Sequence, residues 1–429
     1  MKIFIKLFFI GSLTSLIFPP FFLLPIGFIT IPIFFNYINK ISSNKYILEN
    51  FLKGWSFGFG LNLCLFYWLK NPFLIEEETK NLFFLSYFYI LYSSCYFGIF
   101  SVIINLFNNN NIRLIISPLI FVILEIIKSK LFLNFPWNLF AHVISNNIYL
   151  INPIKYIGIF GISYFVIIIF LLPIPILNIF NKQNVKFNIY YIIINILIII
   201  LFIFFSNNQS FQSKLNKESN FDVILYQNNT KQIDKWDLDK KQNRFDELIN
   251  FIENNSNNNN HTLIIFSETE IPYIVKDNDN LLKFLQSKLD KNTTILIGGI
   301  RKNHQSNDYY NSFFSIDYQD ISYFDKKFLV PFGEYIPLKK FFPFITKLTV
   351  GNKDFTKGEK ERNIKLFNDL NFIPTICYEN IFFEKIIDKT NYKNELIINI
   401  TNDAWFGKYQ GPYQHFYQSV LSSIEYNKY

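Results

Sequence analysis

Three side chains that could carry out covalent catalysis lie far apart in the sequence: Glu268, Lys326 and Cys377. A thiol is a strong nucleophile once it is ionised, and an adjacent cation or a positioned base ionises it. Taken singly, each residue has an ordinary interpretation: a turn or helix-capping acid, a lysine whose stem covers apolar surface, and an inert buried cysteine. Because each follows a strand-like run, where α/β folds collect catalytic residues, their combination favours an active site.

The polar C-terminal half, residues 207–429, contains the elements that must position these side chains. Short buried-strand patterns alternate there with helical patterns, which predicts an α/β domain. The predicted strands are 222–227, 262–268, 293–300, 311–317 and 395–401, with a further strand-like run at 372–376. The predicted helices have one apolar face each: Phe245, Leu248, Ile249 and Ile252 in the first, and Leu281, Leu282, Leu285 and Leu289 in the second. A last helix is predicted from Tyr413 to about Asn427.

The apolar N-terminal half, residues 1–206, predicts a polytopic α-helical membrane domain. Half of all residues are apolar and 53 are Phe, a composition that soluble domains rarely have. Seven apolar runs approach or reach the roughly 20 residues that cross a hydrocarbon core. These runs are 4–19, 20–37, 51–69, 83–107, 113–128, 155–175 and 187–205. Near the end of one run, Glu125 is either a functional intramembrane acid or a helix-end acid that pairs with Lys128 or reaches the interface.

Lysine and arginine residues predict the orientation of these spans, because cytoplasmic loops carry an excess of both. With the N-terminus inside, the inside segments carry Lys2, Lys6, Lys40, Lys45, Lys53, Arg113, Lys182 and Lys186. The outside loops then carry Lys70, Lys80, Lys128, Lys130 and Lys155. An odd number of crossings brings residue 207 to the outer side, which in a bacterium is the periplasmic face of the inner membrane.

The remaining composition argues against other kinds of site. The net charge of +8 is modest and no basic cluster is interleaved with aromatic residues, so nucleic-acid binding is not predicted. The four histidines are scattered without metal-ligand spacing, so we predict no metal and no cofactor. Cys64 and Cys95 lie in apolar runs, a pattern typical of buried small hydrophobic residues, and Cys377 therefore has no obvious disulfide partner.

The order Glu, Lys, Cys resembles the nitrilase superfamily, whose Glu-Lys-Cys triad performs acyl transfer through a thioester. The flanking segments narrow this resemblance to the apolipoprotein N-acyltransferase family. The catalytic half matches through FSETEIP (266–272), KFLVPFGEYIPL (327–338), CYEN (377–380) and TNDAWFG (401–407). YQNNTKQIDKWD (226–237) resembles the family's early periplasmic segment, and NFPWN (134–138) and GWSFGFGLNLCLFYWL (54–69) resemble its membrane half. The resemblance runs nearly end to end.

Carried over residue by residue, the resemblance implies a catalytic triad of Glu268, Lys326 and Cys377. Lys326 is chosen over Lys327 because the family's lysine precedes Leu-Val-Pro by two intervening residues. The further residues that match family positions are Glu334, Glu379 and Tyr378 as supporting active-site groups, Trp236 and Trp405 near the acyl-binding region, and Asn228 as a neighbour.

The resemblance also implies a reaction. An sn-1 acyl chain would pass from a phospholipid, most simply phosphatidylethanolamine, to the α-amino group of a diacylglyceryl apolipoprotein. The enzyme would be a monomer in the bacterial inner membrane, with a nitrilase-like α-β-β-α sandwich on the periplasmic face. Since the family continues past the position of Tyr429, the resemblance implies that the last strands and a last membrane helix are missing here. Two alternatives stay open: a membrane-tethered nitrilase-type amidase, and an inactive shortened membrane protein.

Overall fold

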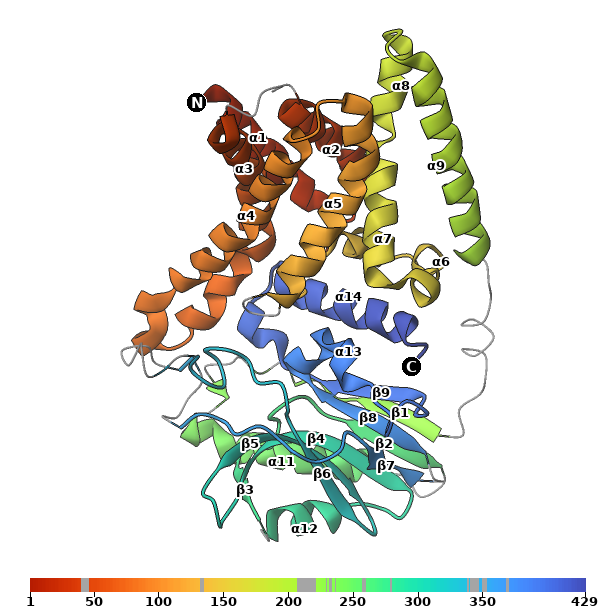
Figure 1. The fold of residues 1–429 in the computed structure, drawn as a ribbon. Helices are drawn as coiled ribbons and strands as arrows, with labels where there is room; N and C mark the ends of the chain where they lie inside the picture. Colours follow the sequence, from red (N-terminus) through yellow and green to blue (C-terminus); the bar gives the residue numbers. More distant parts are fainter. Residues whose placement is uncertain are drawn as a thin grey trace. The chain divides into compact units, whose positions relative to one another are not determined.

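The chain forms two compact units, which Figure 1 shows in a computed structural model. The structure describes residues 1–39, 46–131, 135–206, 221–228, 230, 234, 235, 237–256, 260–277, 280–337, 339, 347, 348, 353–367 and 370–429. The helical unit draws on Met1–Lys70, Phe84–Phe211 and Tyr409–Asn427. The sheet unit draws on Asn71–Phe83, Gln212–Lys408 and Lys428–Tyr429. The two units therefore interleave along the sequence.

Each of the seven predicted apolar runs overlaps a helix of the helical unit. These helices are α1 (Lys2–Thr14), α2 (Leu24–Asn39), α3 (Ile47–Phe66), α4 (Leu85–Asn105), α5 (Asn110–Lys130), α7 (Ile154–Leu171) and α9 (Val185–Ser206). The unit also contains α6 (Ile148–Ile151), α8 (Pro173–Phe180), the 3-10 helix η5 (Phe140–Ile144) and α14 (Gln410–Glu425), which confirms the predicted last helix.

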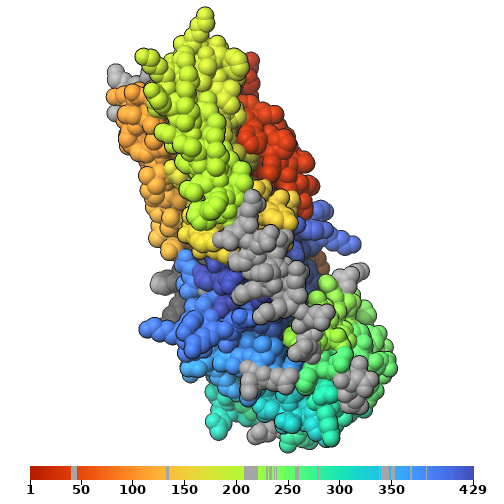
Figure 2. Space-filling model, turned by 90° about the vertical axis from the view of Figure 1, so that its right-hand side faces the viewer, coloured from red at the N-terminus to blue at the C-terminus, as the bar shows by residue number. Residues whose placement is uncertain are grey.

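Three helical stretches among the described residues are long and apolar enough to cross a membrane: Glu77–Asn105, Ile154–Phe180 and Val185–Ser206. The helix α1 has 13 residues, about 20 Å at 1.5 Å per residue, whereas a hydrocarbon core is about 30 Å thick. The full set of seven spans therefore stays a prediction. Figure 2 shows α9, in yellow-green, along the surface of the unit, and it exposes apolar side chains such as Ile194, Leu197 and Phe204.

The helices α1, α3 and α4 pack closely because glycines line their contacts. A Cβ atom on Gly60 of α3 would lie 2.0 Å from the carbonyl oxygen of Phe8 in α1. A Cβ atom on Gly54 would lie 2.0 Å from the carbonyl oxygen of Phe97 in α4. Small residues let helix backbones approach in this way, as they do in membrane helix pairs.

The sequence also predicted that Cys64 and Cys95 of the helical unit are buried. Both side chains are half-buried, so that prediction is wrong.

Two sheets form the centre of the sheet unit. The first contains β1 (Phe221–Leu225), β2 (His261–Ile265), β3 (Ile274–Lys276), β4 (Thr293–Lys302), β5 (Tyr309–Asp317) and β6 (Ile321–Asp325). Its order is β1-β2-β4-β5-β6, with β3 also paired to β4; β1, β2, β3 and β4 pair in parallel and the rest antiparallel. The second contains β7 (Ile364–Lys365), β8 (Asn371–Ile376) and β9 (Leu396–Ile400), and β8 and β9 are parallel.

Two apolar clusters hold these layers together. One packs α11 (Leu238–Asn255) and α12 (Asn280–Gln286) on the first sheet through residues such as Leu248, Ile252 and Leu285. The other lies between the sheets and joins Phe313 of β5 to Phe372 of β8. The helix–sheet–sheet part of the predicted sandwich is visible in Figure 1, with α13 (Phe383–Ile386) following β8 along the chain.

The predicted strands are present, with one correction that concerns the candidate acid. The strand predicted at 262–268 ends at Ile265, so Glu268 lies in a turn beyond the strand. The strands β3, β6 and β7 were not predicted. They are short, and β6 (ISYFD) lacks the continuous apolar run that marks the buried strands.

Gly298 of β4 lets the turn that bears Glu268 approach the sheet. A Cβ atom there would lie 2.5 Å from Thr269 N and 2.7 Å from Glu268 Cα. We expect Gly298→Ala to cost about 1–3 kcal/mol of unfolding free energy, because backbone atoms must move to make room. The measurement is thermal or chemical unfolding of the purified protein.

The neighbouring Gly299→Ala is the matched control. The atoms nearest to its Cβ atom would belong to the side chains of Ile271 and Phe314, at 3.2 Å or more, and these need to move by only a few tenths of an ångström. Equal losses of stability from both substitutions would contradict this account of Gly298.

Candidate active site

The three predicted catalytic residues follow three different strands of the sheet unit. Glu268 lies in the turn after β2, Lys326 directly follows β6, and Cys377 directly follows β8 and opens the 3-10 helix Cys377–Ile381. Two of these turns have left-handed backbone at a non-glycine residue, with φ of 50° at Thr269 and 49° at Cys377. All three side chains are buried, with exposures of 6%, 1% and 6% in chain order.

Glu268, Lys326 and Glu334 form one buried network. Lys326 Nζ lies 3.4 Å from Glu268 Oε1 and 3.0 Å from Glu334 Oε1. The side-chain amide of Asn311 donates to the same two oxygens, at 2.8 and 2.7 Å. The main chain completes it, with Asn402 N donating to Glu268 Oε2 at 3.2 Å and Val330 N donating to Glu334 Oε2 at 2.8 Å. Both carboxylates therefore accept bonds from fixed donors.

The charge of the lysine is secured by this network. Burial alone would lower the pKa of Lys326, but the carboxylates of Glu334 and Glu268 outweigh that effect and raise the pKa above its ordinary value. The ammonium group is thus retained at neutral pH. A fixed cation in a buried site interacts strongly with negative charge that develops nearby.

The charges of Glu268 and Lys326 act on the thiol of Cys377. Burial raises the pKa of its thiol well above the ordinary value, and the negative charge of Glu268 adds to this rise. The charge of Lys326 and a hydrogen bond with Thr401 act in the opposite direction. The resting side chain is therefore a thiol rather than a thiolate, and it requires a base before it can react as a nucleophile.

Glu379 binds Arg362 and the main chain around the catalytic residues. Arg362 binds it with two hydrogen bonds, of 2.7 and 2.9 Å, and both side chains are almost fully buried. The carboxylate also accepts from the main-chain N–H groups of Lys327, Phe328 and Ile376, at 2.8, 3.2 and 2.9 Å. Burial alone would raise the pKa of Glu379, but the charge and hydrogen bonds of Arg362 hold it below its ordinary value.

A second buried lysine approaches the acid from another direction. Lys235 Nζ donates to the carbonyl oxygen of Glu268 at 2.8 Å, and the residue is 4% exposed. Burial lowers the pKa of Lys235 to about 8, while the negative charges of Glu270 and Glu268 partly oppose this shift. Asn228 donates to the Glu270 carboxylate, which gives that predicted neighbour a contact at the edge of the same region.

The structure describes two of the three predicted aromatic residues, Tyr378 and Trp405. Tyr378 is partly buried, with its ring edge-on to Phe382 at 5.0 Å between centroids. Trp405 is half-buried in the 3-10 helix Asp403–Phe406 that follows Asn402. Trp236 lies outside the described residues. Among the residues that the structure describes, no group of three or more His, Cys, Asp or Glu side chains could hold a metal ion.

Four residues of the site were not predicted: Asn311, Arg362, Lys235 and Asn402. Asn402 lies in TNDAWFG and Lys235 in YQNNTKQIDKWD, two segments through which the sequence resembles the family, and Asn311 begins a predicted strand. The sequence therefore contained features that could have indicated three of these four residues. Arg362 lies in the polar stretch EKERNIK (359–365), which gives no sign that its guanidinium is buried.

Comparisons with known proteins agree with this architecture. Residues 10–172 match the family model described as apolipoprotein N-acyltransferase N-terminal domain, and residues 225–429 match carbon-nitrogen hydrolase. An apolipoprotein N-acyltransferase of Rickettsia prowazekii is 31% identical, over 97% of this chain and 82% of its own length. One of Wigglesworthia glossinidia brevipalpis is 32% identical over 100% of this chain and 84% of its own. The chain therefore belongs to the apolipoprotein N-acyltransferase family, an enzyme family of acyltransferases with a carbon-nitrogen hydrolase domain.

Proposed function

We propose that the protein transfers an acyl chain from a phospholipid, through a thioester on Cys377, to the N-terminal amine of a diacylglyceryl apolipoprotein. The observation that carries this proposal is the buried Cys377 thiol, on which two further buried groups, Glu268 and Lys326, act as charges from an ion pair 3.4 Å long. A protonated thiol beside a carboxylate and a permanent cation is the arrangement that covalent acyl transfer requires. The relatives named above are apolipoprotein N-acyltransferases, which supports the choice of acceptor.

In the first half-reaction Cys377 Sγ attacks the sn-1 ester carbonyl carbon of phosphatidylethanolamine. Glu268 takes the thiol proton; its Oε2 atom, which accepts one main-chain bond from Asn402, is the oxygen better suited to this task. Lys326 and the N–H group of Tyr378 stabilise the negative carbonyl oxygen, and losing one such donor typically costs about 2.7–4 kcal/mol of barrier. The ester C–O bond then breaks, and Glu268 returns the proton to the departing lysophospholipid oxygen.

In the second half-reaction the free α-amino group of the lipoprotein attacks the thioester. The new C–N bond forms, the C–S bond breaks, and the amine loses a proton that Glu268 collects and returns to the sulfur of Cys377. Glu334 holds Lys326 through an ion pair at 3.0 Å, and Asn311 keeps the two carboxylates in place. Tyr378 and Trp405 would line the path of the acyl chain.

Both substrates are anchored in a bilayer, which gives the helical unit its role. We propose that the unit crosses the inner membrane of a bacterium several times and that the catalytic domain lies on the periplasmic face. The apolar stretches Ile154–Phe180 and Val185–Ser206 support membrane insertion. The distribution of lysine and arginine supports the orientation.

This orientation can be tested with a reporter fused after Ser206. We expect a reporter that matures only in the periplasm to be active there, because an odd number of crossings precedes the fusion point. A cytoplasmic reporter at the same position is the control and should give no signal. An active cytoplasmic reporter together with a silent periplasmic one would show that the proposed orientation is wrong. The catalytic domain would then have no access to lipoprotein substrates in the periplasm.

The thioester can be observed directly by withholding the acceptor. With phospholipid alone, the peptide that contains Cys377 should gain the mass of one acyl chain, and neutral hydroxylamine should remove it. Cys377→Ala should not label. Glu268→Gln should slow labelling by about 10²–10⁴ for want of a base, and Lys326→Met by about 10²–10³ for want of a charge on the oxyanion.

The matched control for these variants is Cys95→Ala, which removes a half-buried thiol of the helical unit. It should label at the rate of the unmodified protein. If Cys377→Ala acylates lipoprotein as well as the unmodified protein does, the proposed triad is wrong.

Lys235 should give the first half-reaction a characteristic pH dependence. Its ammonium adds positive charge near Cys377, and this charge is present below the Lys235 pKa of about 8 and lost above it. We therefore expect acylation of Cys377 to lose rate above about pH 8. Lys235→Arg should remove this loss, because a guanidinium stays charged, and Lys235→Met should be slow throughout.

The measurement is the rate of thioester formation between pH 6 and 10, with melting temperatures recorded to verify folding. Lys240→Met, at an exposed lysine of α11, is the control and should leave the profile unchanged. If Lys235→Arg keeps the loss above about pH 8, Lys235 is not the group that titrates.

A further inference from the structure

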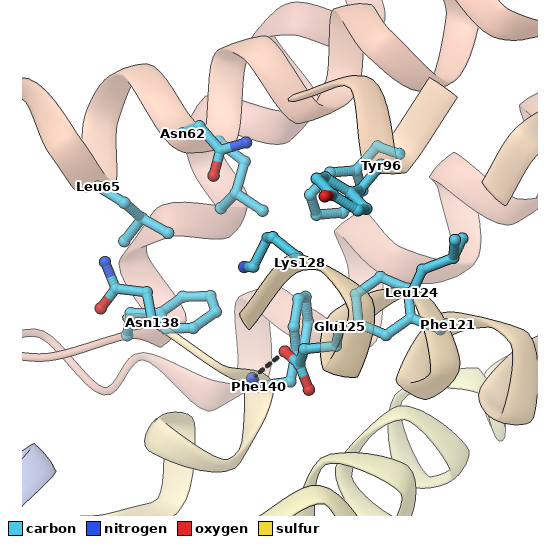
Figure 3. A pocket seen from close by; sticks show the side chains of 12 residues that line it. Asn62, Leu65, Tyr96, Phe121, Leu124, Glu125, Lys128, Asn138 and Phe140 are labelled. Carbon is cyan, nitrogen blue, oxygen red and sulfur yellow. Dashed lines mark hydrogen bonds between the residues drawn. The ribbon is translucent and has the colours of Figure 1, made fainter. Parts of the chain in front are cut away.

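A polar chamber lies inside the helical unit, far along the sequence from the candidate active site. It is lined by α3, α4, α5 and the segment that leads into η5, and the volume open to the centre of a water molecule is about 20 Å³. Figure 3 shows its lining, in which Asn62, Glu125, Lys128 and Asn138 stand among aromatic and aliphatic side chains such as Phe121.

Several polar atoms of this chamber lack a partner among the described residues. Glu125 Oε1 accepts from Phe140 N at 2.8 Å, whereas Glu125 Oε2 has no hydrogen bond of normal length among the described residues, the Ser163 hydroxyl being a nearby donor that interacts more weakly with this carboxyl group. Both polar side-chain atoms of Asn138 are also unsatisfied. These residues are 4% and 5% exposed, so bulk water does not reach the three atoms.

The predicted pairing of Glu125 with Lys128 is not a direct ion pair. Within the described part of the chain, no carboxylate oxygen lies within 4.0 Å of Lys128 Nζ. In Figure 3 the Lys128 side chain extends into the middle of the chamber, between Asn138 and Glu125. An acid and a base thus line the same chamber without forming an ion pair.

Such an arrangement is costly unless something fills it. A buried polar group without a hydrogen bond costs about 1–3 kcal/mol, and a charged group costs more. A single water molecule needs two to four polar partners and a volume of about 10–15 Å³ that is open to its centre. The chamber meets both requirements, since it has the volume and offers a carboxylate oxygen, an ammonium and an amide.

We propose that this chamber is a binding site for an ordered water, held by Glu125 Oε2, Lys128 Nζ and the side-chain amide of Asn138. The water accepts a hydrogen bond from Lys128 and donates to Glu125, and its remaining bond goes to Asn138. It thereby joins α5 to the segment before η5. The neighbouring Trp137 donates to Gln414 of α14 at 2.9 Å, so the joined segment also holds α14 within the unit.

A second cavity of the same volume provides an internal comparison. It is lined by apolar side chains such as Phe34, Phe57 and Leu171, with Ser117 as its one polar residue, whose hydroxyl donates to Leu114 O at 3.2 Å. Apolar cavities of this kind stay dry. Water is therefore assigned by the unsatisfied polar atoms of the chamber and not by empty space as such.

A structure of the full chain in detergent or nanodisc, at a resolution that reveals water, tests the site directly. The expected result is one density peak within hydrogen-bond distance of at least two of the three groups, and none in the second cavity. An empty chamber, a direct contact between Glu125 and Lys128, or a lipid or detergent chain in the chamber would overturn the proposal.

A double-substitution cycle tests the coupling that the water creates. Asn138→Gly suits the left-handed backbone of Asn138 (φ 52°) and removes both polar atoms, while Glu125→Gln preserves shape. Each should lower the melting temperature of the full chain, and the double variant should lower it by less than the sum. Additive shifts would overturn the proposal, because residues without a shared partner behave independently.

Ser117→Ala combined with Asn138→Gly is the matched control, since Ser117 lines only the dry cavity. Its melting-temperature shift should add to that of Asn138→Gly. A control pair as strongly coupled as Glu125 and Asn138 would count against the water, because the coupling would then belong to the whole helical unit.

Discussion

The buried pair of Arg362 and Glu379 fixes the geometry on which the rest of the catalytic half depends. One carboxylate accepts from the main chain directly after Lys326 and from the main chain directly before Cys377. The end of β6 and the end of β8 are thus tied to a single side chain. Removing one member of a buried ion pair typically costs about 3–5 kcal/mol, since the other charge is left uncompensated. The relative placement of cation and thiol therefore rests on a carboxylate that binds the main chain beside each of them.

Glu268, Lys326 and Glu334 are buried, and each has a partner of opposite charge. Two carboxylates surround one buried ammonium, and a neutral amide satisfies both of them. The same burial that strengthens these contacts keeps Cys377 protonated. The proposed chemistry follows from this balance, because the base and the oxyanion partner are already ordered before substrate arrives. An ordered site pays little reorganisation energy during reaction.

Sequence patterns predicted the parts of this structure that depend on local order. Continuous apolar runs marked β1, β2, β4, β5 and β9, and helical periodicity marked α11 and α12, because each pattern is written within a few residues. Buried charge could not be predicted in this way. Arg362 stands in a polar stretch and its partner lies 17 residues further on, so only the folded chain shows that its guanidinium is shielded from water.

The amide of Asn311 also constrains how the gene can change. Its nitrogen donates both hydrogens, one to each carboxylate, so any replacement must supply two donors at one atom. Aspartate, which one base change or spontaneous deamidation would produce, has the same shape but offers acceptors to two groups that are themselves acceptors. Serine and threonine, also one base change away, supply a single donor. None of these three single-step replacements therefore reproduces the two hydrogen bonds that Asn311 donates.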